Sequence, residues 1–286
     1  MPRIWLITGG SSGFGREIAL AAAQNNDTVV VTSRDPTKLT SLAAQGIIPR
    51  HLDLSSSDST IQQVISEVES SVGPIDILVN NAGYILEGAV EETSDDELTA
   101  LFDTNVFAQM RILRAVLPSM RSRRTGVVAN IGSIGGWYGA PAAGFYCASK
   151  AAVAMYTEAL HHEVAHLGIK VTCIEPGYFR TDLLAGEHKV TVQGNIPDLD
   201  AATKEARGAM AAFNHRQPGD PVKGARVIVE ALTGSGRCEG RGLPARLALG
   251  RDAMAAIGGS LAREREMLDG WEEIITSTDC DDVETV

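Results

Sequence analysis

The chain has 286 residues, of which 44% are hydrophobic and 21% are charged. This composition is typical of a globular protein with a large core, and it excludes a wholly disordered chain. The 25 Lys and Arg residues against 36 Asp and Glu residues give a net charge of −11. Nucleic-acid binding and binding to anionic membrane surfaces are therefore disfavoured, because both partners are negatively charged.

The sequence contains neither a recognisable membrane span nor a secretion signal. No apolar run approaches the roughly 20 residues that cross a bilayer. The apolar stretch Ile4–Ile7 is too short for the core of a signal peptide. The four cysteines lie far apart without a CxxC pair, which favours reduced thiols over a disulfide framework. We therefore expect a cytoplasmic protein that binds neither membrane nor nucleic acid.

Seven short, nearly continuous apolar runs are typical of strands that are buried on both faces of a parallel sheet. They are Ile4–Thr8, Thr28–Ser33, Ile47–Asp53, Ile75–Asn80, Gly126–Ile131, Lys170–Glu175 and Leu243–Leu249. Segments with helical periodicity alternate with them at Gly15–Asn25, Asp58–Val72, Asp95–Ser122, Gly144–Leu167 and Pro221–Thr233. This alternation predicts an α/β fold, a Rossmann-like, doubly wound parallel sheet of about seven strands with helices on both faces. We expect Pro118 to kink or end the third helix.

The sequence shows no internal repeat and no low-complexity linker, so we expect residues 1–286 to form a single domain. The stretch Tyr178–Gly219 has no regular pattern, and we expect an irregular loop that acts as a lid over the substrate. Residues 250–286 are a C-terminal extension, whose acidic and polar end, Thr278–Val286, is expected to fray.

A glycine cluster follows the first predicted strand. Its sequence is Thr8-Gly9-Gly10-Ser11-Ser12-Gly13-Phe14-Gly15, and an amphipathic helix comes next. Glycines at a turn from strand to helix let the backbone approach a diphosphate, and the helix N-terminus adds unpaired N–H groups and a positive dipole end. The cluster therefore predicts a dinucleotide-binding site rather than an ordinary tight turn.

The end of the second predicted strand indicates which dinucleotide binds. Dinucleotide-binding folds place an acidic residue there for the ribose diol, whereas arginine accommodates a 2′-phosphate. Ser33 takes the position expected for the acid and Arg34 follows it, which predicts NADP(H). NAD(H) stays an alternative because Asp35 could neutralise Arg34, and a solvated Arg34–Asp35 pair without a binding role is a further one.

Tyr146 and Lys150 lie four residues apart in a helical pattern and therefore share one face. A lysine cation beside a tyrosine favours the phenolate, and lowering a tyrosine pKa from ~10 to ~7 takes about 4 kcal/mol. Alone, this spacing is more often an ordinary amphipathic helix. Here Ser133 follows the strand Gly126–Ile131, at the end of the sheet where ligands bind, and Asn80-Asn81-Ala82-Gly83 closes the fourth strand.

Together these motifs resemble the short-chain dehydrogenase/reductase family, whose single-domain members carry T-G-x3-G-x-G, N-N-A-G and Y-x-x-x-K. The resemblance extends from about residue 3 to residue 181. It implies that Tyr146 is the general acid and base, and that Lys150 holds the nicotinamide ribose and depresses the Tyr146 pKa. It also implies that Ser133 donates a hydrogen bond to the substrate oxygen and that Asn105 supports a water-mediated proton relay.

The resemblance also implies a set of cofactor-binding residues. Asp53 matches the position that bonds adenine, and residues 176–181 resemble the P-G-x-x-x-T segment, with Thr181 on the carboxamide. The full expected set is Gly9, Ser11, Ser12, Gly13, Phe14, Gly15, Arg34, Asp53, Leu54, Asn81, Ala82, Gly83, Tyr146, Lys150, Pro176, Gly177, Phe179 and Thr181. No metal is needed for this chemistry.

We therefore expect an NADP(H)-dependent oxidoreductase, a ketoreductase that interconverts a carbonyl and an alcohol. The side chains expected around the substrate are apolar and favour a hydrophobic molecule, polycyclic ketones included. They are Ile85, Leu86, Trp137, Tyr138, Tyr178, Phe179, Leu183, Leu184 and Phe213. The predicted helices Asp95–Ser122 and Gly144–Leu167 carry dimer faces of the family type, which predicts a homodimer or homotetramer. The alternative is a cofactor-binding protein with a regulatory role or a non-redox reaction such as a cyclisation, although neither needs an acid–base tyrosine.

One motif points to different chemistry. His162-Glu163-Val164-Ala165-His166 spells the HExxH zinc pattern, but no third ligand follows at the spacing of metzincins. We interpret these residues as the solvated end of a helix. Ser133 is not surrounded by a G-x-S-x-G elbow, which argues against a hydrolase.

Overall fold

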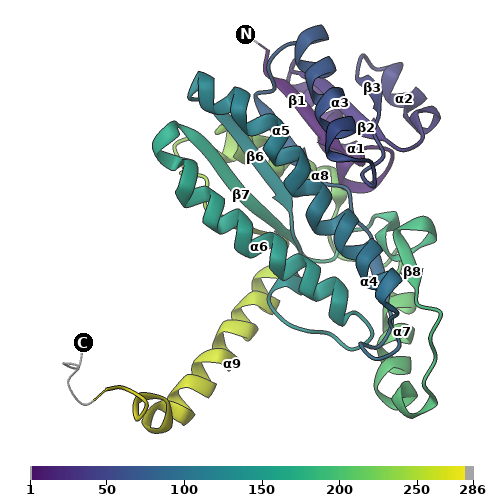
Figure 1. The fold of residues 1–286 in the computed structure, drawn as a ribbon, viewed down its shortest axis with the longest axis vertical. Helices are drawn as coiled ribbons and strands as arrows, with labels where there is room; N and C mark the ends of the chain where they lie inside the picture. The colour runs from purple at the N-terminus through teal and green to yellow at the C-terminus, as the bar shows by residue number, and fades with distance from the viewer. Residues whose placement is uncertain (1, 281–286) are drawn as a thin grey trace.

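The computed structural model describes residues 2–280, with the backbone alone at position 187. Seven parallel strands form one sheet in the order β3-β2-β1-β4-β6-β7-β9. Their bounds are β1 (Ile4–Thr8), β2 (Thr28–Ser33), β3 (Ile48–His51), β4 (Ile77–Asn80), β6 (Gly126–Ile131), β7 (Ile169–Pro176) and β9 (Arg246–Leu249). The predicted Rossmann-like α/β sheet is therefore confirmed (Figure 1).

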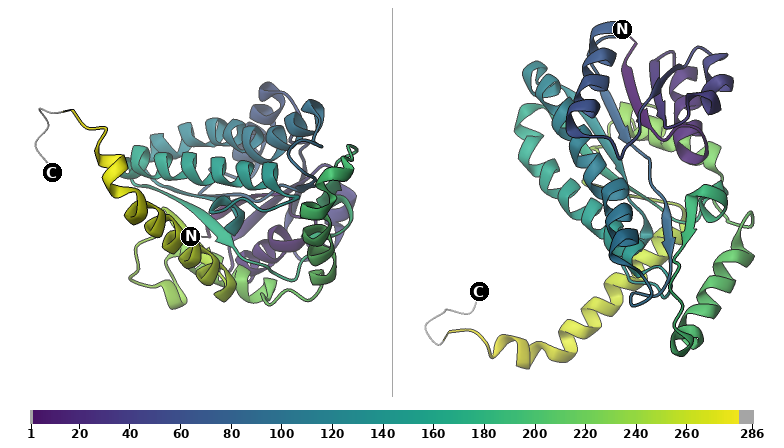
Figure 2. Two further views of the ribbon diagram at one scale, coloured as in Figure 1. Left: turned by 90° about the horizontal axis from the view of Figure 1, so that it is seen from below. Right: turned by 45° about the vertical axis from the view of Figure 1, so that its right-hand side comes forward.

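Helices cover both faces of this sheet (Figure 2). The helices α1 and α8 pack on one face, and α3, α5 and α6 pack on the other. The bounds are α1 (Gly13–Gln24), α2 (Thr40–Ala43), α3 (Asp58–Ser71), α4 (Asp95–Phe102), α5 (Ala108–Arg123), α6 (Gly144–Val164), α7 (Asp200–Phe213), α8 (Pro221–Thr233) and α9 (Arg251–Thr276).

The central strand β1 shows why the strands read as continuous apolar runs. Successive side chains of a strand point to opposite faces of the sheet. Trp5 and Ile7 are fully buried against the α1 and α8 side, and Leu6 between them is fully buried against the α3 and α5 side. Because neither face of β1 meets water at residues 5–7, these three positions favour apolar side chains.

The third predicted helix is divided by a π-helical turn, and Pro118 does not end it. Between α4 and α5 the chain forms a π-helical turn at Asp103–Phe107. Pro118 lies inside α5, which continues to Arg123, so Pro118 does not end the helix, and the alternative expectation of a kink stays a prediction. Val116 and Met120 on either side of Pro118 are fully buried against the sheet, and this packing keeps the helix in place beyond the proline.

The stretch expected to be an irregular lid contains regular structure. Its strand β8 (Lys189–Thr191) pairs in parallel with β5 (Ile85–Glu87) to form a second, two-stranded sheet. The helix α7 follows, so the expectation of an irregular loop is wrong. We keep the name lid for residues 178–219, because they lie against the carboxyl ends of the sheet strands (Figure 1).

The C-terminal extension forms the long helix α9, which projects away from the sheet and its helices (Figures 1 and 2). The expected fraying at Thr278–Val286 falls largely on residues 281–286, which lie outside the described residues. Within residues 2–280, no helix is long and apolar enough to cross a membrane.

Candidate active site

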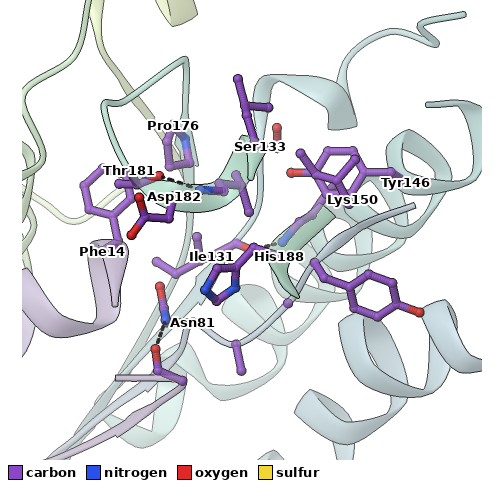
Figure 3. Close-up of a pocket in the computed structure, with 18 of the residues that line it drawn as sticks. Phe14, Asn81, Ile131, Ser133, Tyr146, Lys150, Pro176, Thr181, Asp182 and His188 are labelled. Carbon is purple, nitrogen blue, oxygen red and sulfur yellow. Dashed lines mark hydrogen bonds between the residues drawn. The ribbon is translucent and has the colours of Figure 1, made fainter. Parts of the chain in front are cut away.

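A large cavity of about 1480 Å³ opens at the carboxyl ends of the strands. The sheet order reverses between β1 and β4, and such a reversal is the place where doubly wound sheets bind ligands. The cavity extends from the glycine turn and the end of β2 to Ser133, Tyr146 and the lid. Figure 3 shows that Phe14, Tyr146 and Thr181, which come from distant parts of the sequence, line one space.

The glycine turn is shaped to let a ligand reach the backbone. Gly9 and Gly13 have φ values of +66° and +54°, which residues with a side chain rarely adopt. A Cβ at Gly9 would lie 2.8 Å from Ala82. Both glycines line the cavity, and Ser12 is the N-cap of α1. The N-terminus of α1 therefore faces the space where an anion would bind.

Gly15 is the one glycine of the predicted set that does not line the cavity. A Cβ on it would lie 2.5 Å from the Gly9 oxygen and 2.5 Å from Asn81 Nδ2. Its role is the close packing of α1 on the turn, so the expectation that Gly15 contacts a cofactor is corrected. Asn81 fixes the same turn, because its Nδ2 donates to the carbonyl oxygens of Thr8 and Gly9, both at 3.0 Å.

Arg34 and Asp53 line the other end of the cavity. Hydrogen bonds from Ser55 lower the pKa of Asp53, and the charge of Arg34 contributes to that lowering. The carboxylate of Asp35 accepts hydrogen bonds from the Thr37 N–H and hydroxyl at 3.0 and 2.5 Å. Asp35 thus caps the short 3-10 turn that follows β2 instead of acting only as a counter-ion.

Lys38 is a second cation at this end, and the sequence analysis missed it. It follows β2 on the 3-10 turn Pro36–Leu39 and lines the cavity together with Arg34. The turn brings a residue four positions after Arg34 back to the same opening. The combination of Asp35 as a cap and Pro36 at the first position of a helical turn is the sequence signal that could have placed it there.

Ser133, Tyr146 and Lys150 lie together at the inner end of the cavity (Figure 3). Ser133 follows β6 and accepts a hydrogen bond from the Gly135 N–H at 3.0 Å. Tyr146 and Lys150 come from the first turns of α6, and the Lys150 ammonium lies 5.8 Å from the centroid of the Tyr146 ring. Lys150 Nζ also donates to the Ile131 carbonyl oxygen at 2.8 Å, which anchors the ammonium to the end of β6.

Burial dominates the titration of this pair. It raises the pKa of Tyr146 from 10.0 to about 12, against the opposing effect of a hydrogen bond with Ser133. Burial also lowers the pKa of Lys150 from 10.5 to about 8. The resemblance implied that Lys150 depresses the Tyr146 pKa. Burial is the largest influence on the Tyr146 phenol in the chain itself, and an effect of Lys150 on that phenol stays a prediction.

Asn105 lies behind the cavity and does not line it. It is fully buried in the π-helical turn. Its Oδ1 accepts from the Tyr84 N–H at 3.0 Å, and its Nδ2 donates to the Tyr84 carbonyl at 3.0 Å and to Ser149 Oγ at 3.2 Å. The side chain thus fixes the segment after β4 against α6, and its part in a water-mediated proton relay stays a prediction.

The segment after β7 forms the wall opposite the glycine turn. Pro176, Gly177, Phe179 and Thr181 all line the cavity, as predicted. A Cβ at Gly177 would collide with the carboxylate of Asp252. That carboxylate accepts a hydrogen bond from the Tyr178 N–H at 2.6 Å, so the start of α9 holds this wall in place.

Most of the predicted substrate-pocket residues line the cavity. They are Ile85, Tyr138, Tyr178, Phe179, Leu183, Leu184 and Phe213. Two predictions were wrong. Leu86 alternates with Ile85 on β5 and packs away from the cavity against Leu101 and Val192. Trp137 turns to the far side of β7, where its Nε1 donates to Glu175 at 2.8 Å and its ring stacks on Arg246.

Buried carboxylates fasten the lid to the rest of the molecule. Glu92 is buried, accepts from the backbone N–H groups of Ala89 and Ile196 at 2.9 and 3.1 Å, and pairs with Arg207 of α7 at 2.5 Å. Its pKa is lowered, first by the two backbone hydrogen bonds. Glu87 of β5 pairs with Lys189 of β8 at 3.0 Å. These contacts hold the lid over the cavity.

His188 connects the lid to the glycine turn. It lines the cavity (Figure 3), and its Nε2 lies 3.0 Å from Ser12 Oγ. The sequence analysis missed this residue, because nothing in a local pattern brings residue 188 back to residue 12.

The HExxH residues do not form a site. His162, Glu163 and His166 are exposed at the end of α6 and in the turn after it. Within the described part of the chain, no group of three or more His, Cys, Asp or Glu side chains is arranged to hold a metal ion.

Comparison with known proteins identifies the family. A family model described as short chain dehydrogenase matches residues 3–190. Oxidoreductase BOA17 of Botryotinia fuckeliana is 33% identical over 282 residues, which are 96% of this chain and 98% of that protein. A 3-ketodihydrosphingosine reductase of Bacteroides thetaiotaomicron is 41% identical over 214 residues, which are 72% of this chain and 78% of that protein. The crystal structure of a short-chain dehydrogenase from Streptomyces avermitilis, 39% identical, superimposes with a TM-score of 0.88 and covers 98% of this chain and 99% of its own. The chain belongs to the short-chain dehydrogenase family of oxidoreductases.

Proposed function

We propose that this protein is an NADP(H)-dependent oxidoreductase that interconverts the carbonyl and the alcohol of a hydrophobic small molecule. The observation that carries the proposal is the joint position of Ser133, Tyr146 and Lys150 at one end of a cavity whose other end is the glycine turn. A binding or regulatory protein, or one with a non-redox reaction, would not need an acid–base tyrosine at this place.

The chain's own residues support a proton-transfer role next to the cofactor site. Because the pKa of Tyr146 is raised to about 12, the phenol keeps its proton at neutral pH. It therefore holds the proton that a carbonyl oxygen takes up on reduction. Ser133 would donate a hydrogen bond to the same oxygen and stabilise the negative charge that develops there. Lys150, held by the Ile131 carbonyl, would place a positive charge beside both groups.

A nicotinamide dinucleotide fits the residues that are present. The left-handed glycines Gly9 and Gly13 and the N-terminus of α1 form a cradle at one end of the cavity, and a Cβ at Gly9 would collide with Ala82 beside it. When bound, the nicotinamide ring supplies or accepts the hydride. Solved structures of family members that resemble this chain, at 31% and 29% identity, hold NADP or NADPH.

The end of β2 favours the 2′-phosphate of NADP(H) over the free ribose diol of NAD(H). Two cations, Arg34 and Lys38, line this part of the cavity, and Ser33 replaces the acid that would bond the diol.

The lid side of the cavity favours a hydrophobic substrate. Tyr178 and Phe213 form an edge-to-face pair with ring centroids 5.1 Å apart, and Tyr138, Leu183 and Met210 lie around them. The name of the Bacteroides relative, a ketodihydrosphingosine reductase, is in line with a large apolar ketone.

A direct test follows the absorbance of reduced nicotinamide with NADPH, and then with NADH, over a panel of ketones and aldehydes. We expect oxidation of NADPH with bulky apolar ketones, and slow or no reaction with small polar sugars. A clear preference for NADH would contradict the cofactor assignment, and a preference for polar sugars would contradict the substrate assignment. A single domain spanning residues 1–286, a cytoplasmic location and a homodimer or homotetramer stay predictions.

A further inference from the structure

The helix α9 leaves the body of the protein after its first three turns. Ala253 is fully buried, and Ser260 Oγ donates to the Trp137 carbonyl oxygen at 2.7 Å. From Leu261 to Cys280, every residue is exposed. Figures 1 and 2 show the same separation, with the later turns of α9 extending away from the sheet and its helices.

One side of this exposed half of α9 is largely apolar. Large side chains stand three, four or seven residues apart, which places them along one side of the helix. Their exposed fractions range from 43% to 60%, and they are Leu261, Met267, Leu268, Trp271, Ile274 and Ile275. We call these six residues the α9 stripe. Glu264, which lies three residues after Leu261 and seven before Trp271, is a charged residue on the same side of the helix.

Such a helix is poorly stable when water surrounds it. A helix shorter than about 12–15 residues is marginal in isolation, and most helices in proteins are stabilised by packing of an apolar face. The exposed segment, residues 261–276, is only slightly longer than this limit, and Gly270 lowers its intrinsic helix propensity. A contiguous exposed apolar surface of this kind marks an interaction site.

The charges beside the stripe match a second copy of the same helix. In a heptad repeat with Leu261, Leu268 and Ile275 in equivalent core positions, Arg265 and Glu272 flank the stripe on the same side. When two such helices run antiparallel, Arg265 of one lies against the partner's Glu272, and the reverse contact follows by symmetry. In that register Leu268 packs on the partner's Trp271, and Met267 on the partner's Ile274.

A parallel pair would not use these charges. Arg265 would then face the partner's Ser260 and Glu272 would face the partner's Met267, neither of which is charged. A membrane surface fits less well, because residues 261–276 carry five acidic residues against two arginines and anionic lipids would repel them.

We propose that α9 is a self-association element, which pairs antiparallel with α9 of a second copy through the stripe over residues 261–278. This goes beyond the proposed reaction and does not depend on it. The pairing joins two molecules through helices that lie outside the family-type dimer faces on α4, α5 and α6. Because Asp252 at the start of α9 holds the Tyr178 N–H, the same helix also contacts the cavity wall.

Charge reversal tests the pairing and its direction. The full-length protein and its Arg265→Glu, Glu272→Arg and Arg265→Glu/Glu272→Arg variants are compared by sedimentation velocity over a range of concentrations, at low and high salt. We expect each single variant to self-associate about 10-fold more weakly through this step, because two ion pairs become repulsive. We expect the double variant to recover the wild-type association, since both pairs are restored with the charges exchanged.

Truncation of the stripe gives an independent measurement. We expect Trp271→Ala to weaken the association at least about 30-fold, because each tryptophan packs against the partner. Met254→Ala is the matched control: Met254 lies on the same helix, is 71% exposed, and is outside the paired residues. Circular dichroism checks that all variants are folded.

Three results would overturn the proposal. The first is a Trp271→Ala protein that assembles like Met254→Ala. The second is a double charge reversal that behaves like the single reversals or leaves association unchanged throughout. The third is wild-type protein that does not associate through α9 but inserts Trp271 into phosphatidylcholine or phosphatidylserine vesicles, detected as a blue shift of tryptophan emission that Trp271→Ala abolishes.

Discussion

Replacement of Lys150 by methionine should change how protein stability depends on pH. The Lys150 pKa falls from 10.5 to about 8 on burial. Between these values the unfolded chain binds a proton that the folded chain does not, so the free energy of unfolding rises with pH in this window. Below pH 8 both states are protonated, and the folded protein bears the full cost of a buried ammonium.

The lowering from 10.5 to about 8 corresponds to ~3 kcal/mol in full, of which about 1 kcal/mol should be recovered between pH 7 and pH 9. Lys150→Met removes the charge and retains an apolar side chain of similar length. It leaves the Ile131 carbonyl without its donor, which costs about 1 kcal/mol at every pH. We therefore expect the variant to be about as stable as wild type or more stable at pH 7, and to lose this advantage as the pH rises.

Urea unfolding of both proteins without cofactor, at intervals from pH 6.5 to pH 9.5, measures the effect. The difference between the two proteins isolates Lys150, because all other titrating groups are shared. Above pH 10 the raised pKa of Tyr146 acts in the opposite direction, since the unfolded chain then loses a proton that the folded chain retains. If the unfolding free energies of wild type and Lys150→Met change by the same amount from pH 7 to pH 9, the assignment of a buried, destabilised Lys150 ammonium is refuted.

Three further predictions concern the cofactor and the lid. Arg34→Ala should raise the KM for NADPH about 10- to 100-fold, because charge-assisted hydrogen bonds to the 2′-phosphate are lost. The KM for NADH should stay nearly unchanged, and equal effects on the two KM values would contradict a 2′-phosphate contact. His188→Ala should raise the KM for NADPH about 2- to 10-fold with little change in kcat, because the contact with Ser12 closes the lid on the glycine turn; an unchanged KM would exclude that role. Glu92→Gln should speed proteolytic cleavage within residues 191–216 about 10-fold, since it weakens the pair with Arg207, and unchanged cleavage would show that the pair does not hold the lid.

The sheet was predictable from the sequence because it is buried on both faces. Continuous apolar runs such as Thr28–Ser33 have few other interpretations, and β2 has these bounds. The strands β5 and β8 have three residues each, too few to show a periodicity. Polar residues such as Lys204 and Glu205 within α7 obscured the apolar pattern of that helix.

The candidate site was predictable where a motif fixes both the residue and its element. Ser133, Tyr146 and Lys150 are of this kind, and they line one cavity. Errors arose where the direction of a side chain depends on tertiary packing. Trp137 follows a single 3-10 turn, and the buried Glu175 draws its indole to the far side of β7. Burial raises the Tyr146 pKa, and no local sequence pattern reports how deeply a side chain is buried.

The contacts between α9 and the segments around the candidate site are a feature that only the structure reveals. Asp252 bonds the Tyr178 N–H, and Ser260 bonds the carbonyl of Trp137, which ends the turn that begins at Ser133. The C-terminal extension therefore braces two sides of the site from outside, although none of its described residues, 250–280, contributes a side chain to the cavity lining.

Transfer of deuterium is the most direct test of the central claim, that Tyr146 and Ser133 serve hydride transfer to a carbonyl. Wild-type protein and Tyr146→Phe are incubated with NADPH deuterated at the transferred position and an apolar ketone, and the alcohol is analysed by mass spectrometry. We expect one deuterium per alcohol with the wild type, and a rate at least about 100-fold lower with Tyr146→Phe, which should still bind NADPH. Alcohol formed at an equal rate by the variant, or alcohol without deuterium from the wild type, would contradict the account.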